Sequence, residues 1–435
     1  MKADGLIRSG TLSLSIRVAG MALGLAAAII LARLLGPTAY GEFSYVLALV
    51  ALIAIPAQLG LPNLVIRETA RAQHAKEPGR TLALWRWVHV VVAGMSGLCM
   101  LGLLAAFLLF PSSEIRFETV LWALPLLPLL ALGNIRGAAL RGLGWVNLGQ
   151  LPESLLHGAF LLLGIGVVFV IGTGVPVDAA DAMKLQCAAA LLAFLVGAYW
   201  LALHRPTAAE RFIPSPEMRR SWLTSSLILG LVAGLQSFNS SADIVMLGWM
   251  RDNETVGVFK VAILMSVVAS FTLASLNAVI MPRVVTLLQS GQQAALQQIV
   301  SRTARISFGA ALATLLALFF FGTPLIALLF GEAYSVAYPA MIILVVGHAI
   351  NAMFGPVSLL LTMAGHERDT LRGLALGATV NVAANLTLVP VYGGVGAAAG
   401  TTLSLLTWNA FLFFRARSRL GIVCLPLHPA LAIPQ

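Results

Sequence analysis

Charge is scarce in this sequence. Only 10% of its 435 residues are charged, 59% are apolar, and the mean hydropathy is +0.92. This composition excludes an ordinary soluble globular protein, in which about 25% of residues are charged. The formal net charge of +10 would suggest a nucleic-acid partner for a soluble domain, but in a membrane protein it reflects how positive charge divides between loops. We therefore expect an integral protein of the lipid bilayer that binds no nucleic acid.

Catalytic and metal-binding motifs are also missing. The three cysteines have no CxxC spacing, so they predict neither a metal site nor a disulfide framework. None of the four lysines follows a glycine, which excludes the GxxxxGK[ST] phosphate loop of an ATPase. The seven histidines show no HxxxH spacing, and there is no GxSxG elbow. We expect a protein that is not an enzyme and has no organic cofactor.

Long apolar runs are abundant. A transmembrane helix needs about 20 mainly apolar residues. Twelve segments meet this requirement, at residues 11–35, 42–66, 82–110, 118–140, 149–172, 183–204, 222–249, 257–282, 302–330, 336–364, 371–390 and 395–414. Strands of an outer-membrane barrel are shorter and alternate in polarity, so these runs favour helices. The predicted fold class is an all-α polytopic membrane protein of about 12 transmembrane helices.

Positive charge is divided unevenly between the connections. Of the 27 lysines and arginines, 21 fall at the two termini and in every second connection, five fall in or beside the other connections, and Arg17 lies inside a helix. The positive-inside rule assigns the richer set to the cytoplasm. We therefore predict that both termini are cytoplasmic.

A polar connection between the sixth and seventh helices divides the chain. Residues 205–221 contain three prolines and four arginines. They predict an N-terminal six-helix lobe over residues 1–204, a cytoplasmic linker over 205–221, and a C-terminal six-helix lobe over 222–435. Matching residues recur at an offset of 216, pairing Gly41 with Gly257, Phe43 with Phe259, and Arg67 with Arg283. Such halves would be parallel repeats that rock against each other around a central site.

Four segments of the sequence occur in a characteristic order. They are LARLLGPTAYGEFSYVLALV, AQLGLPNLVIRETAR, ALRGLGWVNLGQLPESLL and NLTLVPVYGGVGAAAGTTLS. Their order and spacing resemble those of the oligosaccharide/polysaccharide lipid flippases, the O-antigen flippase type, of the multidrug/oligosaccharidyl-lipid/polysaccharide exporter superfamily. The similarity extends over essentially the whole chain.

The resemblance implies a specific activity. Two six-helix lobes around a central cavity would move an undecaprenyl-diphosphate-linked oligosaccharide from the cytoplasmic to the outer leaflet of the bacterial inner (plasma) membrane. The movement would occur by alternating access and would serve the synthesis of a surface polysaccharide, such as O-antigen or exopolysaccharide. Expected partners are a polysaccharide polymerase and glycosyltransferases.

Arg17 is the seventh residue of the first apolar segment. An arginine at the bilayer centre costs about 2.5–3.5 kcal/mol on insertion scales, so its presence calls for a compensating role. Guanidinium groups bind phosphate oxygens bidentately, and flippases of the resembling family line their cavity with first-helix arginines. Related lipid II flippases have a second arginine where this sequence has Leu23. The alternative is that Arg17 reaches the cytoplasmic surface, about 10 Å away.

Two further arginines are candidates for the diphosphate-binding cavity. Arg136 and Arg283 lie near the ends of predicted helices, where extension of the side chain to the membrane surface is the alternative. The sequence therefore predicts Arg17, Arg136 and Arg283 as substrate-binding residues.

Asp243 lies deep in the seventh predicted helix, where it must be protonated, paired or bound to a cation. Asn381 and Asn385 share one face of the eleventh helix because they are spaced i, i+4. Thr401 lies in the twelfth helix. Carboxylate, amide and hydroxyl oxygens suit a hard cation, so these four residues predict a Na⁺ or H⁺ coupling site. The alternative is hydrogen bonding between helices.

Two rival functions remain open. A multidrug/cation antiporter of the same superfamily would place an acidic residue in the first-lobe cavity, where the sequence offers only Glu153, near a helix end. A membrane polysaccharide polymerase would need catalytic charges on an outer loop, and the longest outer connection has only Asp178, Asp181 and Lys184.

Overall fold

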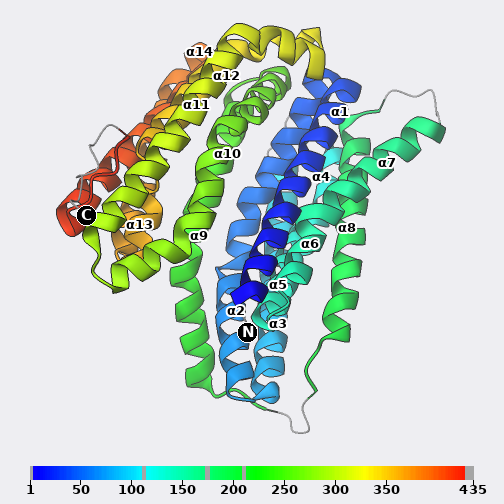
Figure 1. Ribbon diagram of the computed structural model, residues 1–435. Coiled ribbons are helices and arrows are strands. Elements are labelled where there is room, and N and C mark those ends of the chain that lie inside the picture. The colour runs from blue at the N-terminus through cyan, green and yellow to red at the C-terminus, as the bar shows by residue number, and fades with distance from the viewer. Residues whose placement is uncertain (1–2, 110–113, 172–176, 208–211, 427–435) are drawn as a thin grey trace. The chain divides into compact units, whose positions relative to one another are not determined.

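The computed structural model describes residues 3–109, 114–171, 177–207 and 212–426 (Figure 1). Residues 110 and 172, where two predicted helices end, and residues 208–211 of the predicted linker lie outside this description. The chain forms two compact units, residues 1–237 and 238–435. Within the described residues, both units are built from helices.

The first unit contains most of the helices. Its elements are α1 (Ala3–Gln58), α2 (Leu61–His74), α3 (Pro78–Leu109), α4 (Phe117–Ala123), α5 (Leu126–Gly142), α6 (Val146–Leu151), the π-helix η1 (Pro152–Leu156), α7 (His157–Ile171), α8 (Ala179–Leu203) and the first part of α9 (Pro216–Met250). The second unit contains the rest of α9, then α10 (Asn253–Gln289), α11 (Gln293–Phe330), the 3₁₀-helix η2 (Glu332–Ala337), α12 (Tyr338–Met353), α13 (Val357–Met363) and α14 (Glu367–Leu420).

The predicted fold class is confirmed. Among the described residues, nine helices are long and apolar enough to cross a membrane. Two of them contain a break at a glycine, Gly36 in α1 (φ 71°) and Gly393 in α14 (φ 56°). Glycine adopts this positive φ at little cost, and in Figure 1 the two arms of α1 lie side by side. Counting each broken helix as two spans gives eleven among the described residues. The remaining predicted span lies in α9, which is 35 residues long and is not among the nine.

The core of the first unit packs α5 against α2, α3 and the first part of α9. Leu61, Trp85, Val88 and Ile135 are buried in one cluster, and Trp222 of α9 joins them with only 3% of its surface exposed. The rings of Trp87 and Trp222 lie 5.5 Å apart. This core fixes the position of α5, which carries several polar side chains described below.

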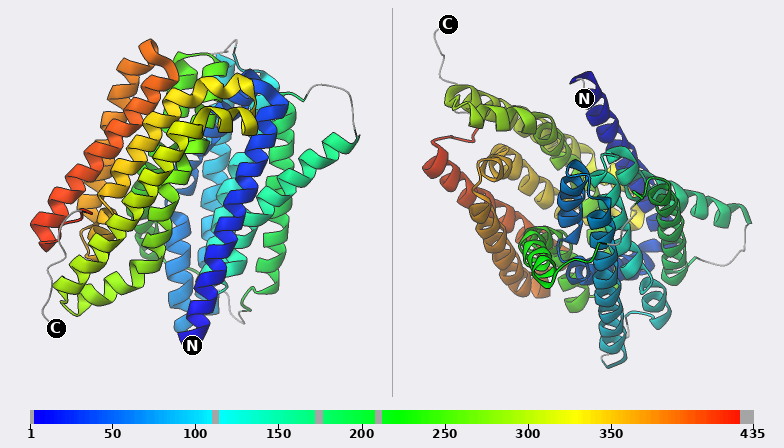
Figure 2. Two further views of the ribbon diagram at one scale, coloured as in Figure 1. Left: turned by 45° about the horizontal axis from the view of Figure 1, so that its top comes forward. Right: turned by 90° about the horizontal axis from the view of Figure 1, so that it is seen from below.

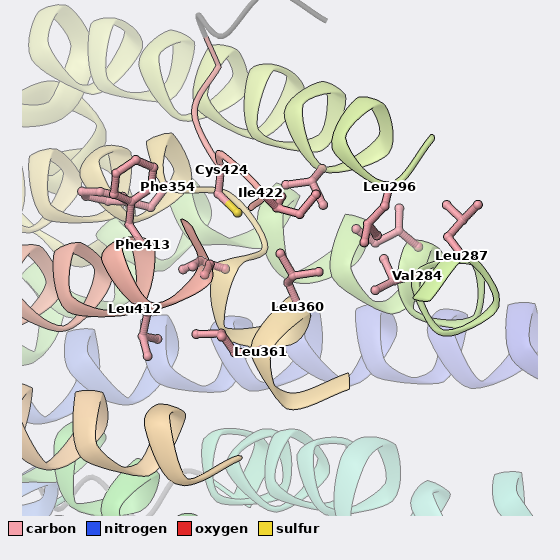
Figure 3. Packing of buried hydrophobic residues seen from close by; sticks show 14 residues of the cluster. Val284, Leu287, Leu296, Phe354, Leu360, Leu361, Leu412, Phe413, Ile422 and Cys424 are labelled. Atoms are coloured by element: carbon pink, nitrogen blue, oxygen red, sulfur yellow. The ribbon is translucent and has the colours of Figure 1, made fainter. Parts of the chain in front are cut away.

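The segment after α14 packs into the hydrophobic core of the second unit (Figure 3). Ile422 and Cys424 are buried among residues of α10, α11, α13 and α14. The Gln297 side-chain amide accepts a hydrogen bond from the Val423 backbone N–H at 2.8 Å and donates one to the Val423 carbonyl at 2.7 Å. Burial raises the pKa of the Cys424 thiol to about 12. Cys424 is therefore a protonated packing residue.

Helix α9 contributes to both compact units. Trp222 packs in the core of the first unit, whereas Asp243 belongs to the second, and the boundary along the chain falls between Ser237 and Phe238. The sequence assigns all of the seventh helix to the C-terminal lobe. The predicted lobes, 1–204 and 222–435, stay a prediction.

Candidate functional site

The first unit contains a polar cavity of about 470 Å³. Four elements supply its lining: Arg17, Gly20 and Met21 from α1, Asn134, Gly137 and Arg141 from α5, Gly149 and Gln150 from α6, and Glu153 and Ser154 from η1. Figure 2 shows this unit from two further directions. Polar side chains from helices that are distant in the sequence therefore converge on one cavity.

Glycines allow these helices to approach closely. A Cβ atom on Gly137 would lie 2.5 Å from the Gly149 carbonyl oxygen, and a Cβ atom on Gly149 would lie 2.5 Å from the Gly137 carbonyl oxygen. On α1, a Cβ atom on Gly20 would lie 1.8 Å from the Ser154 carbonyl oxygen. Any larger residue at these positions would separate the backbones. The glycines thus place the side chains of α1, α5 and α6 around a common space.

The π-helix determines where Glu153 points. Pro152 begins η1 and has no backbone N–H, so the regular i→i−4 ladder cannot continue through it. Such single-turn π-helices occur often at functional sites. Here the turn brings both Glu153 and Ser154 to the cavity.

Two arginines of the lining are held through their Nε atoms. Arg17 Nε donates to Gln150 Oε1 at 3.1 Å, and Ser13 Oγ donates to the same oxygen at 3.0 Å. Arg141 Nε donates to the Gly137 carbonyl oxygen at 3.2 Å. Within the described residues, the terminal nitrogens of both guanidinium groups have no hydrogen-bond partner. They can therefore bind an anion that enters the cavity.

Arg136 lies behind the cavity wall and not among the lining residues. It is 2% exposed, and it donates hydrogen bonds to the Glu153 carboxylate and to the carbonyl oxygens of Ala193 and Phe194. Gly197 makes room for it, since a Cβ atom there would lie 2.3 Å from Arg136 Cζ. Arg136 thus neutralises Glu153 and fixes its direction.

The charges of this site are unbalanced. Arg17, Arg136 and Arg141 contribute three positive charges, and Glu153 contributes one negative charge. The site therefore has a net charge of +2, so the cavity attracts anions and repels cations. Sequence reasoning missed Arg141, because this residue lies at the end of a helix among the basic residues of the cytoplasmic connections.

The predicted residue Arg283 belongs to the other unit. It is exposed on α10, between Pro282 and the buried Val284. Its predicted role in substrate binding stays a prediction.

The second unit brings together the four residues predicted for ion coupling. Asp243 of α9 is 5% exposed, and its Oδ1 accepts hydrogen bonds from Asn381 Nδ2 at 2.8 Å and Asn385 Nδ2 at 2.7 Å. Its Oδ2 accepts a hydrogen bond from Thr401 Oγ1 at 2.6 Å. The two arms of α14 supply these donors from opposite sides of the break at Gly393.

The donor set of this cluster fits a small cation or a proton. The Asn385 Oδ1 atom is buried without a hydrogen-bond partner, next to the Asp243 carboxylate. A Cβ atom on Gly400 would lie 2.6 Å from it, so any larger residue there would displace the Asn385 amide. Buried acceptors normally have a partner, and an orphaned oxygen beside a carboxylate suits a hard monovalent cation. In the described part of the chain, no group of three or more His, Cys, Asp or Glu residues forms a metal site.

These features define a helical membrane protein with a polar cavity, and comparison with known proteins identifies its family. The family model described as "Polysaccharide biosynthesis protein" matches residues 6–288. The chain therefore belongs to the polysaccharide biosynthesis protein family. The resemblance drawn from the sequence motifs is confirmed. No curated protein matches the sequence.

Solved structures show the same fold. A multidrug resistance MATE family transporter of the MOP superfamily, in an inward-facing conformation, has a TM-score of 0.75 and 18% identity, with 95% of this chain and 98% of that chain covered. The lipid II flippase MurJ, in an inward closed conformation, has a TM-score of 0.71 and 13% identity, with coverages of 94% and 87%. A MOP superfamily transporter from Pyrococcus furiosus has a TM-score of 0.64 and 17% identity, with coverages of 95% and 94%. At these identities the similarity establishes the fold.

Proposed function

We propose that this protein is a flippase that moves an undecaprenyl-diphosphate-linked oligosaccharide across the bacterial inner membrane by alternating access. The observation that carries the proposal is the cavity of the first unit, where Arg17 and Arg141 present free guanidinium nitrogens and positive charge is in excess. Guanidinium groups bind phosphate oxygens in bidentate geometry, which suits a diphosphate. The family description and the structural similarity to a lipid II flippase support the same substrate class.

The other lining residues have distinct roles in this proposal. The amides of Asn134 and Gln150 offer hydrogen bonds to the sugar that follows the diphosphate. Arg136 is a positioning residue: it pairs with the Glu153 carboxylate at the wall of the cavity and so offsets its negative charge. Arg283 is a further candidate for anion binding in the second unit.

A cation antiporter fits the cavity less well. Such a transporter needs a free acidic group for its substrate, and the acidic residue of the cavity, Glu153, already pairs with Arg136. Two unpaired arginines nearby would repel a cationic drug. We therefore favour an anionic lipid substrate, although a MATE transporter has the same fold.

Ion coupling is assigned to the Asp243 cluster. Net movement requires that an ion or the substrate bind one orientation of the transporter more tightly than the other. A Na⁺ ion or a proton bound by Asp243, Asn381, Asn385 and Thr401 would provide this difference.

The remaining features of the proposal concern cellular context. The protein itself catalyses no covalent chemistry, so glycosyltransferases must build the glycan before transport and a polymerase must act after it. Delivery to a surface polysaccharide such as O-antigen or exopolysaccharide, and cytoplasmic placement of both termini, belong to the same proposal.

Deletion of the gene tests this function. A deletion strain should accumulate lipid-linked oligosaccharide on the cytoplasmic leaflet and lose the surface glycan. Complementation with Arg17→Ala should fail, since one charge-assisted hydrogen bond contributes about 1.5–3 kcal/mol, or roughly tenfold to a hundredfold in affinity. Arg17→Lys should restore export partially, because lysine keeps the charge and loses the bidentate geometry.

The control is Arg417→Ala, which removes an exposed arginine near the end of α14. It should complement fully at an equal expression level. Normal export by the Arg17→Ala variant would contradict the proposal.

A further inference from the structure

The two halves of the sequence match at the polar cavity around Arg17 and Arg141, which we call the arginine cavity. The offset of 216 residues that relates the halves places Asp369 at the position of Glu153, which lines this cavity. The neighbouring residues match at the same offset, Gly149 with Gly365 and Ser154 with Thr370. The second unit therefore has a carboxylate at the position equivalent to Glu153.

Asp369 is the centre of a cluster of arginines in the second unit. It lies in the first turn of α14 and is 4% exposed. Arg372 Nη1 donates a hydrogen bond to Asp369 Oδ1 at 3.4 Å. Arg415 Nε lies 3.8 Å from Oδ1, and Arg419 Nε lies 3.6 Å from Oδ2. We call these four residues the Asp369 cluster. It has three positive charges and one negative charge, so its net charge of +2 equals that of the arginine cavity site.

Two guanidinium groups of the Asp369 cluster have free donors. Asp369 pairs with Arg415 and Arg419 through their Nε atoms. In the part of the chain that the structure describes, the terminal nitrogens of both groups have no hydrogen-bond partner. The Arg415 guanidinium also lies 5.2 Å from the centroid of the Phe411 ring, which restricts its orientation. Both groups therefore present N–H forks of the kind that bind phosphate oxygens.

Close packing between the two arms of α14 holds the cluster in place. A Cβ atom on Gly373 would lie 2.8 Å from Leu412 Cδ2, and one on Gly377 would lie 3.1 Å from Trp408 Cβ. Leu412 is in turn buried in the core of the second unit (Figure 3). Arginines from both arms therefore face one carboxylate before any ligand binds, and a preformed site costs a ligand little in ordering.

The cluster lies where the first arm of α14 begins and the second arm ends. Each arm has roughly half of the helix's 54 residues, or about 40 Å, which exceeds the ~30 Å hydrocarbon core of a bilayer. These ends therefore reach the level of the lipid head groups. Apolar side chains are exposed on the bilayer side: Leu376, 40% exposed, is one turn from Arg372, and Phe414, 64% exposed, precedes Arg415.

We propose that the Asp369 cluster is a second phosphate-binding site, which holds the head group of an anionic phospholipid. The guanidinium forks and the net charge of +2 select the phosphate, and a zwitterionic lipid would bring an ammonium group that this charge repels. The exposed apolar surface beside the cluster favours a lipid over free phosphate, because the acyl chains can cover it. Basic clusters at helix ends recognise lipid head groups by this chemistry. The site lies in the second unit and does not depend on the proposed function.

The test uses the purified full chain with Arg17→Ala/Arg141→Ala, so that the arginine cavity contributes no phosphate binding. Native mass spectrometry of the detergent-solubilised protein measures the affinities of phosphatidylglycerol and phosphatidylcholine with identical acyl chains. Phosphatidylglycerol should bind at least ~10-fold more tightly, which corresponds to one charge-assisted hydrogen bond. Adding Arg415→Gln/Arg419→Gln should abolish this preference. Glutamine keeps a donor for Asp369, so this variant should fold.

The matched control is Arg368→Gln/Arg417→Gln. Both arginines are exposed at the same ends of the two arms, and among the described residues neither pairs with an acidic residue. The control removes the same charge and should keep the preference for phosphatidylglycerol. Arg415→Lys/Arg419→Lys keeps the charge but loses the forks, so it should keep only part of the preference.

The outcomes separate a built site from a basic surface. Loss of the preference in the matched control, or its full retention in either variant of Arg415 and Arg419, would overturn the site. Inorganic phosphate that competes as strongly as phosphatidylglycerol would assign the cluster to free phosphate and overturn the lipid site. Each of these results leaves the proposed function intact, because transport is assigned to the arginine cavity of the first unit.

Discussion

The ion pair between Arg136 and Glu153 yields a quantitative prediction about how the first unit holds its cavity. Its two side chains differ in burial, since 3% of the Arg136 side chain is exposed and 32% of the Glu153 side chain. Glu153→Leu would leave a buried guanidinium with backbone carbonyls as its partners, and breaking a buried pair in this way costs about 3–5 kcal/mol. Arg136→Met would leave a carboxylate that faces the cavity on one side, which costs less, about 1–3 kcal/mol.

The double variant distinguishes pairing from packing. Replacing both partners by apolar residues of similar volume is often nearly neutral, so Arg136→Met/Glu153→Leu should lose no more than about 2 kcal/mol. The coupling energy, which is the sum of the two single effects minus the double effect, should therefore be at least about 2 kcal/mol. The double variant should still lose transport, because the wall of the arginine cavity has changed.

The assay is the free energy of unfolding in mixed micelles titrated with denaturing detergent. Glu118→Leu is the control: its exposed pair with Lys184, at 2.9 Å, should contribute no more than about 1 kcal/mol. Additive single effects, or a smaller loss for Glu153→Leu than for Arg136→Met, would refute the reasoning from burial.

Two other predictions concern ions and pH. Asp243→Asn should abolish the Na⁺ or pH dependence of transport, with Asp252→Asn at the N-cap of α10 as the control, and an unchanged ion response would rule out the coupling role. Partial burial raises the pKa of Asp178, but the Asp181 backbone N–H and the Arg116 guanidinium lower it more, so it lies below the ordinary 3.8. The ionised Asp178 carboxylate therefore stabilises the folded state at pH values above 3.8. This stabilisation is lost as the pH falls through the pKa that Asp178 has in the folded state. Asp178→Asn should lower the free energy of unfolding at pH 6 by at most about 1 kcal/mol, because the pair with Arg116 is partly exposed. The free energy of unfolding should also fall less steeply below about pH 4 in this variant. An unchanged pH dependence in that range would contradict this assignment.

The fold class could be predicted because hydropathy needs no tertiary information. A run of about 20 apolar residues has one stable form in a bilayer, which is a helix. The helix breaks were harder to place: the second predicted helix, residues 42–66, continues through Leu59 and Gly60, which have φ values of 44° and 68°. Nothing in the hydropathy marks this break, because the residues on both sides of it are apolar.

The sequence predicts more of the Asp243 cluster than of the arginine cavity. The sequence predicts the four residues of the Asp243 cluster as one set, because the i, i+4 spacing of Asn381 and Asn385 gives them a shared face. In the structure both amides lie within hydrogen-bond distance of Asp243. The role of that cluster in ion coupling stays a prediction. The contacts of a buried aspartate could be anticipated because an unpaired charge in a membrane demands partners.

The arginine cavity could be predicted only in part. Arg17 was found because a charge within an apolar run is conspicuous, and the structure places it at a cavity. Arg141 was missed, and Arg136 was expected among the substrate-binding residues, because the directions of both side chains depend on the Gly137–Gly149 approach and on the π-helix at Pro152. Neither feature has a periodic signal in the sequence. The second cation therefore comes from α5, while Leu23 of α1 lines apolar space.

The central claim is that the arginine cavity carries a lipid-linked diphosphate across the membrane. Reconstituted vesicles test it most directly, using a polyprenyl-diphosphate-linked oligosaccharide and a glycosidase added outside to report which leaflet the sugar occupies. Wild-type protein should expose sugar that was initially protected, and the Arg17→Ala/Arg141→Ala variant, inserted in equal amounts, should match protein-free vesicles. Wild-type translocation by that double variant would contradict the account.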